Sequence, residues 1–364
     1  MQTTVAIVGG GLAGLYAGKL LHAARIDFRL LEARERLGGR VLSVDASGAP
    51  SEDGFDLGPS WFWPEAQPQV AALVRELGVK AFPQHSDGDV IFHRMSREAP
   101  RRYGSTHQEP QSMRIVGGTG ALIQALVRNL PGSRVLLHAR VQQMTLRSTQ
   151  VELATEGPDG RGETVSAEQV IAAVPPRLLA RISFSPAMDS ATEELWRETP
   201  TWMAPHAKFL AIYDRPFWRD AGLSGTAQSM VGPLAEIHDA TTASGKAALF
   251  GFPGISADAR ASLGSTALTR ACLEQLAHLF GPEARNPLAT LLKDWAADPL
   301  TATAADRSAG GHPSPSAGPW VTGDWQKLLS LAGSETSAIE PGYLAGAVSA
   351  AERAVSEVMQ RLRA

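Results

Sequence analysis

Hydrophobic and polar positions near the start of the chain follow a pattern typical of a strand, a glycine-rich turn, a helix and a second strand. Val5–Val8 is entirely apolar, as expected for a parallel strand that is buried on both faces. The strand runs directly into Gly9, Gly11 and Gly14, and a helical segment follows. A second apolar strand then ends at Glu32. This order predicts a Rossmann-like unit with a phosphate-binding turn.

Further along the chain, apolar segments alternate with helical stripes. Residues 170–174 form a buried strand that ends at Pro175 and Pro176, because proline cannot donate to a β-ladder. Residues 209–213 and 328–332 have the same strand character. Residues 70–77 and 122–130 have helical spacing, and residues 341–348 open a final helix. Residues 82–111 are mostly polar, and residues 301–319 are expected to form a loop.

The glycine turn has the composition of a phosphate-binding loop. Glycines allow a tight turn, a close approach of the backbone to a pyrophosphate and close packing of helix on strand. The amides of Leu12 and Ala13, at the start of the helix, would point at the anion. Glu32 lies 18 residues after Gly14, where a carboxylate accepts hydrogen bonds from ribose hydroxyls and disfavours NADP. A glycine-rich turn without a ligand is the alternative, but the flanking elements and the acid argue against it.

The residues after Glu32 narrow the choice of dinucleotide. Arg34 precedes two adjacent glycines, Gly38 and Gly39, and Arg40 follows them. The glycines suit a second close approach of the backbone, with the guanidinium available to a phosphate. This arrangement resembles the flavin-containing amine oxidase family, which includes monoamine oxidases and L-amino acid oxidases. The resemblance implies FAD in place of NAD.

Three later blocks of sequence are similar to the same family, in the same order. Gly58-Pro59-Ser60-Trp61 resembles its second flavin-contacting loop, although Pro59 replaces the usual glycine, and residues 114–122 resemble its central glycine motif. Gly333-Ser334-Glu335 and Gly342-Tyr343-Leu344 resemble the closing flavin motif. The cofactor-binding residues that this resemblance implies are Gly9, Gly11, Leu12, Ala13, Gly14, Glu32, Ala33, Arg34, Gly38, Gly39, Arg40, Gly58, Pro59, Ser60, Trp61, Val141, Gly333, Ser334, Glu335, Gly342, Tyr343 and Leu344.

A chain of 364 residues exceeds the usual size of one hydrophobic core, so two domains are expected. The resemblance implies an α/β fold with a glutathione-reductase-like FAD-binding domain and an interleaved, reduced α+β substrate domain. We expect the FAD-binding domain to comprise residues 1–80, 114–178 and 320–364, and the substrate domain residues 81–113 and 179–319.

Charge and composition exclude several classes of partner. A net charge of −3 provides no basic field for nucleic acid. No apolar stretch approaches the ~20 residues that cross a bilayer, so no membrane partner is expected. The single cysteine, Cys272, has the helical spacing of a core residue and cannot form a disulfide within the chain. Together with the lack of a leader-like N-terminus, this makes the cytoplasm the expected compartment.

Lys208 is the first candidate catalytic residue. It is one of six lysines and lies in an otherwise apolar strand. A buried cation is unfavourable unless it is paired, so its presence there indicates a function. In the resembled family the matching lysine holds a water against flavin N5. The implied reaction is oxidation of an amine to an imine by hydride transfer to FAD, and reoxidation by O2 or another acceptor, with H2O2 formed from O2. A strand lysine whose tip reaches solvent is the alternative.

Tyr343 is the second candidate catalytic residue. It matches one wall of the aromatic pair that flanks the substrate nitrogen in monoamine oxidases. Ala304 falls where some relatives link a cysteine to the flavin, and Ala305 falls at the second aromatic wall. We therefore expect FAD without a covalent link and an open aromatic pair, with Trp61, Phe62, Trp202 or Trp295 as possible replacements.

Three readings of function remain open at this stage. The first is an FAD-dependent amine oxidase or dehydrogenase, the second a desaturase-like or protoporphyrinogen-oxidase-like enzyme, and the third a flavin-binding subunit without turnover. No metal-ligand spacing or hydrolase motif occurs, so no metal site is expected. Arg94, Arg101 and Arg102 could serve an amino acid carboxylate, but none is assigned. The substrate and the oligomeric state stay open.

Overall fold

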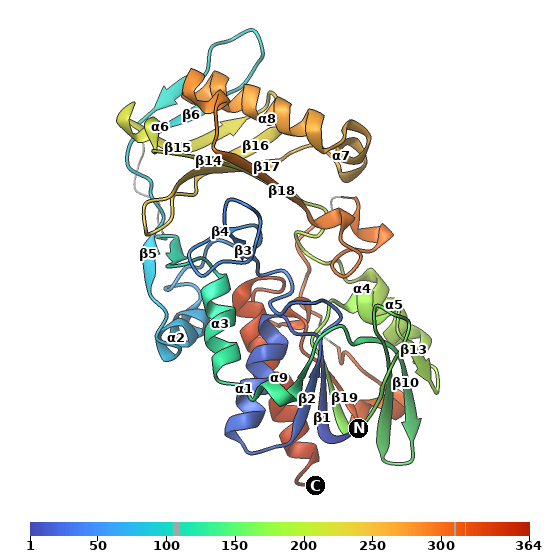
Figure 1. The fold of residues 1–364 in the computed structure, drawn as a ribbon. Coiled ribbons are helices and arrows are strands. Elements are labelled where there is room, and N and C mark those ends of the chain that lie inside the picture. The colour runs from blue at the N-terminus through green and yellow to red at the C-terminus, as the bar shows by residue number, and fades with distance from the viewer. Residues whose placement is uncertain (105–109, 309–310, 317) are drawn as a thin grey trace.

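The structure is a computed structural model that describes residues 1–104, 110–308, 311–316 and 318–364. Two large β-sheets dominate it, and in Figure 1 one lies above the other with both chain ends at the base of the lower part. The mixed α/β character expected from the sequence is confirmed. Residues 105–109 of the predicted polar segment 82–111 lie outside the described residues. The same holds for residues 309–310 and 317 of the predicted loop 301–319.

The lower sheet carries the N-terminal strand β1 at its centre. β1 pairs in parallel with β2 on one side and β12 on the other, and β9 and β19 extend the parallel part. A meander of β10, β11 and β12 completes the sheet, with β13 at its edge. The strands are β1 (Gln2–Val8), β2 (Phe28–Leu31), β9 (Val135–Leu136), β10 (Arg140–Arg147), β11 (Gln150–Glu156), β12 (Thr164–Ala172), β13 (Ser183–Ser185) and β19 (Leu329–Leu331).

β1 is apolar throughout because both of its faces are covered. Val5 and Ile7 pack into one hydrophobic core, while Ala6 and Val8 pack into a second core on the opposite face. The first core joins β1 to α1, α3 and α9, which lie together on one side of the sheet in Figure 1. The helices of the lower part are α1 (Leu12–Ala23), α2 (Pro68–Glu76), α3 (Gly120–Arg128), α4 (Pro176–Leu179), α5 (Ser190–Glu198) and α9 (Leu344–Arg361).

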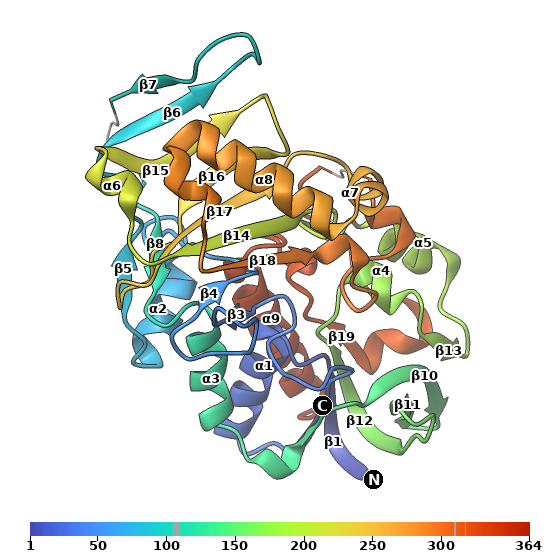
Figure 2. The same cartoon turned by 45° about the horizontal axis from the view of Figure 1, so that its top comes forward.

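The upper sheet contains the strand of Lys208, and its two faces differ in what covers them. Phe209 and Ala211 pack beneath α8 in one core, whereas Leu210 and Ile212 face the lower part in another. Figure 2 shows α8 lying across the outer face of this sheet. In sheet order the strands are β18 (Ala289–Asp294), β14 (Ala207–Tyr213), β17 (Ala247–Pro253), β16 (Leu234–Asp239), β15 (Leu223–Ser229), β6 (Asp89–His93) and β7 (Arg101–Tyr103); the helices are α6 (Phe217–Asp220), α7 (Ala257–Leu263) and α8 (Ser265–Phe280).

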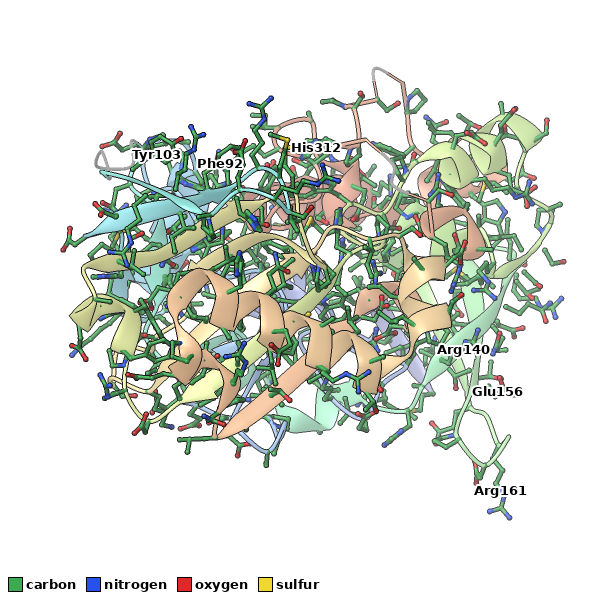
Figure 3. The ribbon with its side chains drawn as sticks, turned by 90° about the horizontal axis from the view of Figure 1, so that it is seen from above. Phe92, Tyr103, Arg140, Glu156, Arg161 and His312 are labelled. Carbon is green, nitrogen blue, oxygen red and sulfur yellow. The ribbon has the colours of Figure 1, made fainter. Side chains whose placement is uncertain are left out.

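Smaller elements connect the two parts. β3 (Ser43–Val44) pairs with β4 (Phe55–Asp56), and β5 (Ala81–Pro83) pairs with β8 (Met113–Ile115). Single 3₁₀ turns occur at Gly132–Arg134, Pro282–Arg285, Trp295–Ala297, Ala304–Asp306, Gly323–Lys327 and Ser334–Thr336. The β6–β7 hairpin, with Phe92 and Tyr103, and the β11–β12 turn, with Arg161, project at opposite ends of the molecule (Figure 3).

The strand pairing shows where the chain leaves the lower part of the molecule for the upper part. β13 pairs with β10 of the lower sheet, and Trp196 of α5 packs in the lower core. Residues 183–198 therefore lie with the lower sheet, although the sequence placed the start of the substrate domain at residue 179. The reason is that the chain continues along the edge of the lower sheet after Pro176 before it crosses to β14. The remaining domain boundaries stay a prediction.

None of the helices in the described part of the chain is both long enough and apolar enough to cross a membrane.

Candidate functional site

A cavity of about 460 Å³ lies between the two sheets. The carboxyl ends of β1, β2 and β12 contribute to its walls, and so do β14, β16 and β17 of the upper sheet. Most of the residues predicted from the sequence as cofactor-binding line it: Gly9, Gly11, Leu12, Ala13, Glu32, Ala33, Arg34, Gly38, Gly39, Arg40, Gly58, Pro59, Ser60, Trp61, Val141, Gly333, Ser334, Gly342, Tyr343 and Leu344. The pattern of glycines and acid near the N-terminus thus marks one end of a continuous cavity.

The three glycines of the first turn differ in what a side chain at each position would meet. Gly9 has a φ of +104°, a conformation that a side chain disfavours. A Cβ on Gly14 would lie 1.9 Å from the carbonyl oxygen of Gly9, so Gly14 permits α1 to pack on the turn. A Cβ on Gly11 would meet only the Gly38 oxygen, at 3.9 Å. Gly11 is therefore not required by packing, and a side chain there would instead enter the cavity.

Two backbone segments meet at this end of the cavity. Gly11 and Gly38 form an isolated parallel bridge, and the Gly38 amide donates to the Gly10 carbonyl at 2.8 Å. A Cβ on Gly39 would lie 3.3 Å from the Gly11 Cα, and Gly39 has a φ of +57°. No side chain of the described residues caps the N-terminus of α1. Its first amides therefore remain available to an anion between the two loops.

Glu32 is fixed by main-chain amides. One carboxylate oxygen accepts a hydrogen bond from the Gly10 amide at 2.7 Å, and the other accepts from the Arg34 amide at 2.8 Å. Each oxygen keeps a further lone pair, since a carboxylate can accept about four hydrogen bonds. Glu32 is buried and lines the cavity. Its carboxylate is thus oriented before any ligand arrives.

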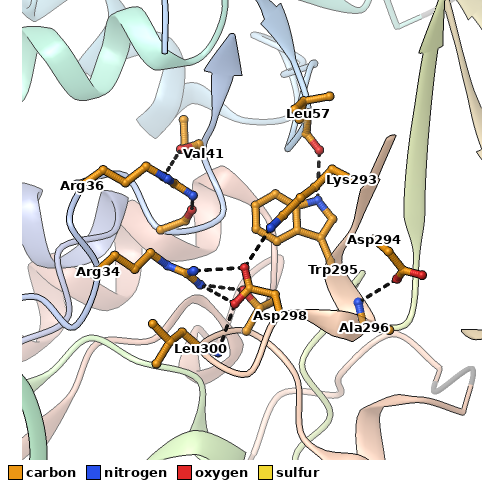
Figure 4. A network of polar contacts seen from close by, with 12 residues as sticks. Arg34, Arg36, Val41, Leu57, Lys293, Asp294, Trp295, Ala296, Asp298 and Leu300 are labelled. Atoms are coloured by element: carbon orange, nitrogen blue, oxygen red, sulfur yellow. Dashed lines mark hydrogen bonds and ion pairs between the residues drawn. The ribbon is translucent and has the colours of Figure 1, made fainter. Parts of the chain in front are cut away.

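Arg34 is engaged by the protein itself (Figure 4). Its guanidinium donates two hydrogen bonds to Asp298, both at 3.0 Å, and a third to Thr301. Lys293 adds a second cation at 2.9 Å from Asp298. The side chains of Arg34 and Asp298 are nearly buried, at 12% and 7% exposure. Arg34 lines the cavity, and its ion pair and hydrogen bonds link the loop after Glu32 to the segment after β18.

Arg40 and Glu335 form the second such link. The Arg40 guanidinium pairs with Glu335 at 2.5 Å and donates to Ser334 at 3.0 Å. Glu335 is completely buried and does not line the cavity, and neither does Gly14. Glu335 therefore orients Arg40, rather than contacting a cofactor as the sequence suggested. The partner of Arg40 is 295 residues away in the chain, which explains why sequence alone did not indicate it.

Lys208 lies in the part of the cavity wall that the upper sheet contributes. Its side chain is buried, and its ammonium donates to the Gly58 carbonyl at 2.9 Å and to the Ser60 hydroxyl at 2.7 Å. Burial lowers the pKa of Lys208 to about 7; nearby Asp56 opposes this and Arg114 adds to it. An ammonium has three donors, so one remains beyond these two bonds. The alternative of a lysine whose tip reaches solvent is wrong for this residue.

Tyr343 belongs to an aromatic cluster that walls the cavity. Its ring lies 4.3 Å from that of Trp202 and 6.3 Å from that of Trp63, centroid to centroid. Gly342 has a φ of +87°, and a Cβ there would lie 2.9 Å from the Trp202 Cβ. The glycine before Tyr343 therefore allows the two rings to approach. Trp61, Trp63, Trp202 and Trp295 all line the cavity, whereas Ala304 and Ala305 lie in a 3₁₀ turn outside the lining.

Comparison with known proteins identifies the family. A family model described as flavin containing amine oxidoreductase matches residues 99–359, more than half of the chain. The chain belongs to this family. A second model, described as an NAD(P)-binding Rossmann-like domain, matches residues 7–77. The predicted family, enzyme class and Rossmann-like fold are thus confirmed.

This amine oxidoreductase has relatives along its whole length. It is 24% identical to a probable flavin-containing monoamine oxidase A of Dictyostelium discoideum, with 98% of both chains covered. It is also 24% identical to a putrescine oxidase of Kocuria rosea, over 85% of this chain and 86% of the other. A solved structure of putrescine oxidase bound to putrescine shares its fold, with a TM-score of 0.81, 21% identity and 99% of both chains covered.

FAD is the cofactor of this family member, and the cavity fits it. The open position at Gly11 and the uncapped amides of α1 suit a diphosphate, and the oriented Glu32 carboxylate suits ribose hydroxyls. The only cysteine, Cys272, is a buried residue of α8 that packs into the core of the upper sheet, and it does not line the cavity. This agrees with FAD bound without a covalent link to cysteine.

Several residues of the cavity wall were not singled out in the sequence. Glu236 is in β16, Phe252 is in β17 and His206 directly precedes β14. On the side of the lower sheet, the wall also contains Arg140 of β10 and Arg181. A register shift in β10 between Val141 and Gln143 helps to direct this segment. Arg94, Arg101 and Arg102 lie on the β6–β7 hairpin or next to it and are not in the lining. The sequence of β16 has no period of two that could have suggested Glu236, and its pairing with β17 shifts register between Leu234 and Glu236.

Proposed function

We propose that this protein oxidises a substrate amine to an imine, which water hydrolyses to a carbonyl compound and ammonia. The glycine loops, the first amides of α1 and the Glu32 carboxylate would hold FAD, which would supply an acceptor for the hydride from the carbon next to the amine nitrogen and return both electrons to O2 as H2O2. The observation that supports this most is Lys208, a buried cation in the wall of a cavity that begins at the phosphate-binding loops.

Lys208 is placed to control a proton and a water. Its two hydrogen bonds to Gly58 and Ser60 fix the amine at the cavity wall, and its third donor is left for a cavity water. With its pKa lowered by burial to about 7, the side chain exchanges a proton near neutral pH. The residue can therefore hold the water that the imine consumes and buffer the proton released on oxidation.

Tyr343 and Trp202 would orient the amine. Their rings are 4.3 Å apart and tilted by 51°, so they present an apolar corner in place of two facing rings. Aromatic faces attract cations and exclude water, which favours a bound amine next to the redox centre. Trp202 is the residue that takes the place of the aromatic side chain missing at Ala305. It comes from the segment before β14 and was one of the four aromatic residues that the sequence offered for this position.

The names of the relatives do not select one substrate. Those relatives are described as monoamine oxidases, putrescine oxidase and an L-amino acid dehydrogenase. The geometry must therefore supply the argument for substrate class.

The test is an anaerobic reduction assay on the purified flavoprotein. A panel of alkylamines, arylalkylamines and diamines is mixed with the protein, loss of flavin absorbance is followed, and H2O2 is measured after oxygen is admitted. Bleaching by amines followed by stoichiometric peroxide supports the proposal. Bleaching only by polyenes or porphyrinogens would replace it with a desaturase-like activity, and no bleaching by any compound would favour a flavin-binding subunit without turnover.

A variant pair tests the role of the lysine. Lys208→Met should retain FAD and reduce the rate of flavin reduction by roughly 10²-fold or more, the usual effect of removing a proton-transfer group. Lys80→Met is the matched control, because Lys80 is exposed and outside the cavity wall. Equal rates in wild type and Lys208→Met would remove Lys208 from the mechanism.

A further inference from the structure

Three side chains form a row across the upper sheet and face the cavity. Glu236 of β16 is directly opposite Phe252 of β17. Phe209 of β14 is opposite Gly251, so the antiparallel register places Lys208 opposite Phe252. All three residues line the cavity. Because neighbouring strands are about 4.8 Å apart, the backbones of Lys208 and Glu236 are about 10 Å apart.

Glu236 is held in place by its neighbours. His238, two residues along the same strand face, lies 2.6 Å from the Glu236 carboxylate through its Nε2. The His238 ring packs edge-on against Trp61, at 4.8 Å between centroids, and beside Phe250, at 5.3 Å. The imidazole is therefore fixed, and it fixes the carboxylate in turn. This hydrogen bond lowers the pKa of Glu236, so the side chain is anionic at neutral pH.

The negative charge at this position has little compensation from the protein. Among the described residues, no lysine or arginine forms an ion pair with Glu236, and His238 is its one charged or polar side-chain partner. Lys208 in the same row is held away by Gly58 and Ser60. The Glu236 side chain keeps 48% exposure, although it is part of the cavity wall. A carboxylate open to the cavity can accept hydrogen bonds from a ligand.

The surface between the two charged residues is aromatic. Phe252 lies between Lys208 and Glu236, and Trp61 lines the cavity beside His238. Such a surface suits a chain of methylene groups, while the carboxylate suits an ammonium. The complementary molecule is an amine with an apolar spacer and a second positive charge.

We infer that Glu236, supported by His238, binds a second ammonium group of the substrate and so selects alkyl diamines over monoamines. This inference rests on the proposed amine oxidation and assigns the substrate class of the same cavity. One amino group would lie at the end walled by Tyr343 and Lys208, and the other would donate to the Glu236 carboxylate. Phe252 and Trp61 would contact the methylene spacer.

The experiment measures binding and turnover separately. Isothermal titration calorimetry with the FAD-loaded protein gives the affinity for a series of α,ω-diaminoalkanes and for the monoamines of equal chain length. Wild type should bind the best diamine roughly 10- to 100-fold more tightly than its monoamine, the range of a hydrogen bond to a charged group. Glu236→Gln should reduce this ratio to near one, whereas Glu168→Gln, an exposed carboxylate on β12, should keep it.

The two proposals fail in different ways. Equal diamine-to-monoamine affinity ratios in wild type and Glu236→Gln would overturn the inference, whether or not the flavin is reduced. A wild type that prefers diamines, loses the preference on Glu236→Gln and yet shows no flavin reduction would keep the diamine site and reject amine oxidation. His238→Phe provides a second variant: it should lower the ratio several-fold by releasing the carboxylate, and an unchanged ratio would count against the supporting role.

Discussion

A buried lysine should make the stability of this protein depend on pH in a defined window. Burial lowers the pKa of Lys208 from its ordinary value of 10.5 to about 7. Between these two values the unfolded chain binds a proton that the folded protein does not, so the free energy of unfolding rises with pH. The difference between 10.5 and about 7 corresponds to at most about 5 kcal/mol over the whole window, at 1.36 kcal/mol for each pH unit. Between pH 7 and pH 9 the expected gain is about 2 kcal/mol.

Lys208→Met removes this titration and little of the volume. The substitution leaves the Gly58 carbonyl and the Ser60 hydroxyl without their donor, at a cost of about 1–3 kcal/mol for each group left unsatisfied. That cost does not change with pH, whereas the penalty of the buried lysine does. The difference in stability between wild type and Lys208→Met should therefore shift in favour of wild type by about 2 kcal/mol from pH 7 to pH 9.

Urea unfolding at the two pH values, with saturating FAD in every sample, measures this shift. Comparing the two proteins cancels the titration of every group that they share, and Lys80→Met controls for the loss of a lysine at an exposed position. If wild type and Lys208→Met gain the same stability from pH 7 to pH 9, the lysine is not held near a pKa of 7. Lys208 would then not exchange a proton near neutral pH.

Three further variants test the architecture of the cofactor end. Gly11→Ala should fold with near wild-type stability, because its Cβ would meet only the Gly38 oxygen, at 3.9 Å. The same Cβ would enter the cavity, so this variant should bind FAD at least ~10-fold more weakly. Gly14→Ala should instead lower the melting temperature, since its Cβ would lie 1.9 Å from the Gly9 oxygen. Fluorescence titration and thermal melting of the apoprotein separate the two, and similar behaviour would contradict the assigned roles. Asp298→Asn leaves Arg34 buried without its anion and should cost about 3 kcal/mol in urea unfolding, so a change below about 0.5 kcal/mol would show that the pair contributes little.

Local pattern was sufficient to predict the cofactor end of the site. Val5–Val8, the glycine turn and Glu32 are close in sequence, and each obeys a rule that depends on near neighbours. The structure places β1, α1 and β2 where the pattern predicted them, and the Glu32 carboxylate beside the turn. The later family blocks brought Gly58, Gly333 and Tyr343 to the same cavity, which periodicity alone could not have shown.

Apart from Lys208, the wall that the upper sheet contributes could not be predicted, because it depends on strand register. Glu236 is in β16, whose residues do not alternate between apolar and polar, so the sequence does not indicate which side chains face the cavity. Only the pairing of β16 with β17 and of β17 with β14 sets Glu236 in the row of Lys208. Trp202 was one of four aromatic candidates from the sequence, but only the structure shows that it meets Tyr343, which is 141 residues away in the chain.

The two arginines of the cofactor loop line the cavity, as the motif predicted, and both are also held in ion pairs that the motif did not indicate. Arg34 and Arg40 were expected to face the cofactor, yet each is already paired, with Asp298 and with Glu335. Two cations that are neutralised by buried carboxylates add little net positive charge to the cavity. We therefore expect main-chain amides to stabilise most of the charge of a diphosphate. These are the first amides of α1, which carry the partial positive charge of the helix terminus, and amides of the facing glycine loop. The arginines instead fix the positions of those loops, so that the main chain is already arranged to receive the anion.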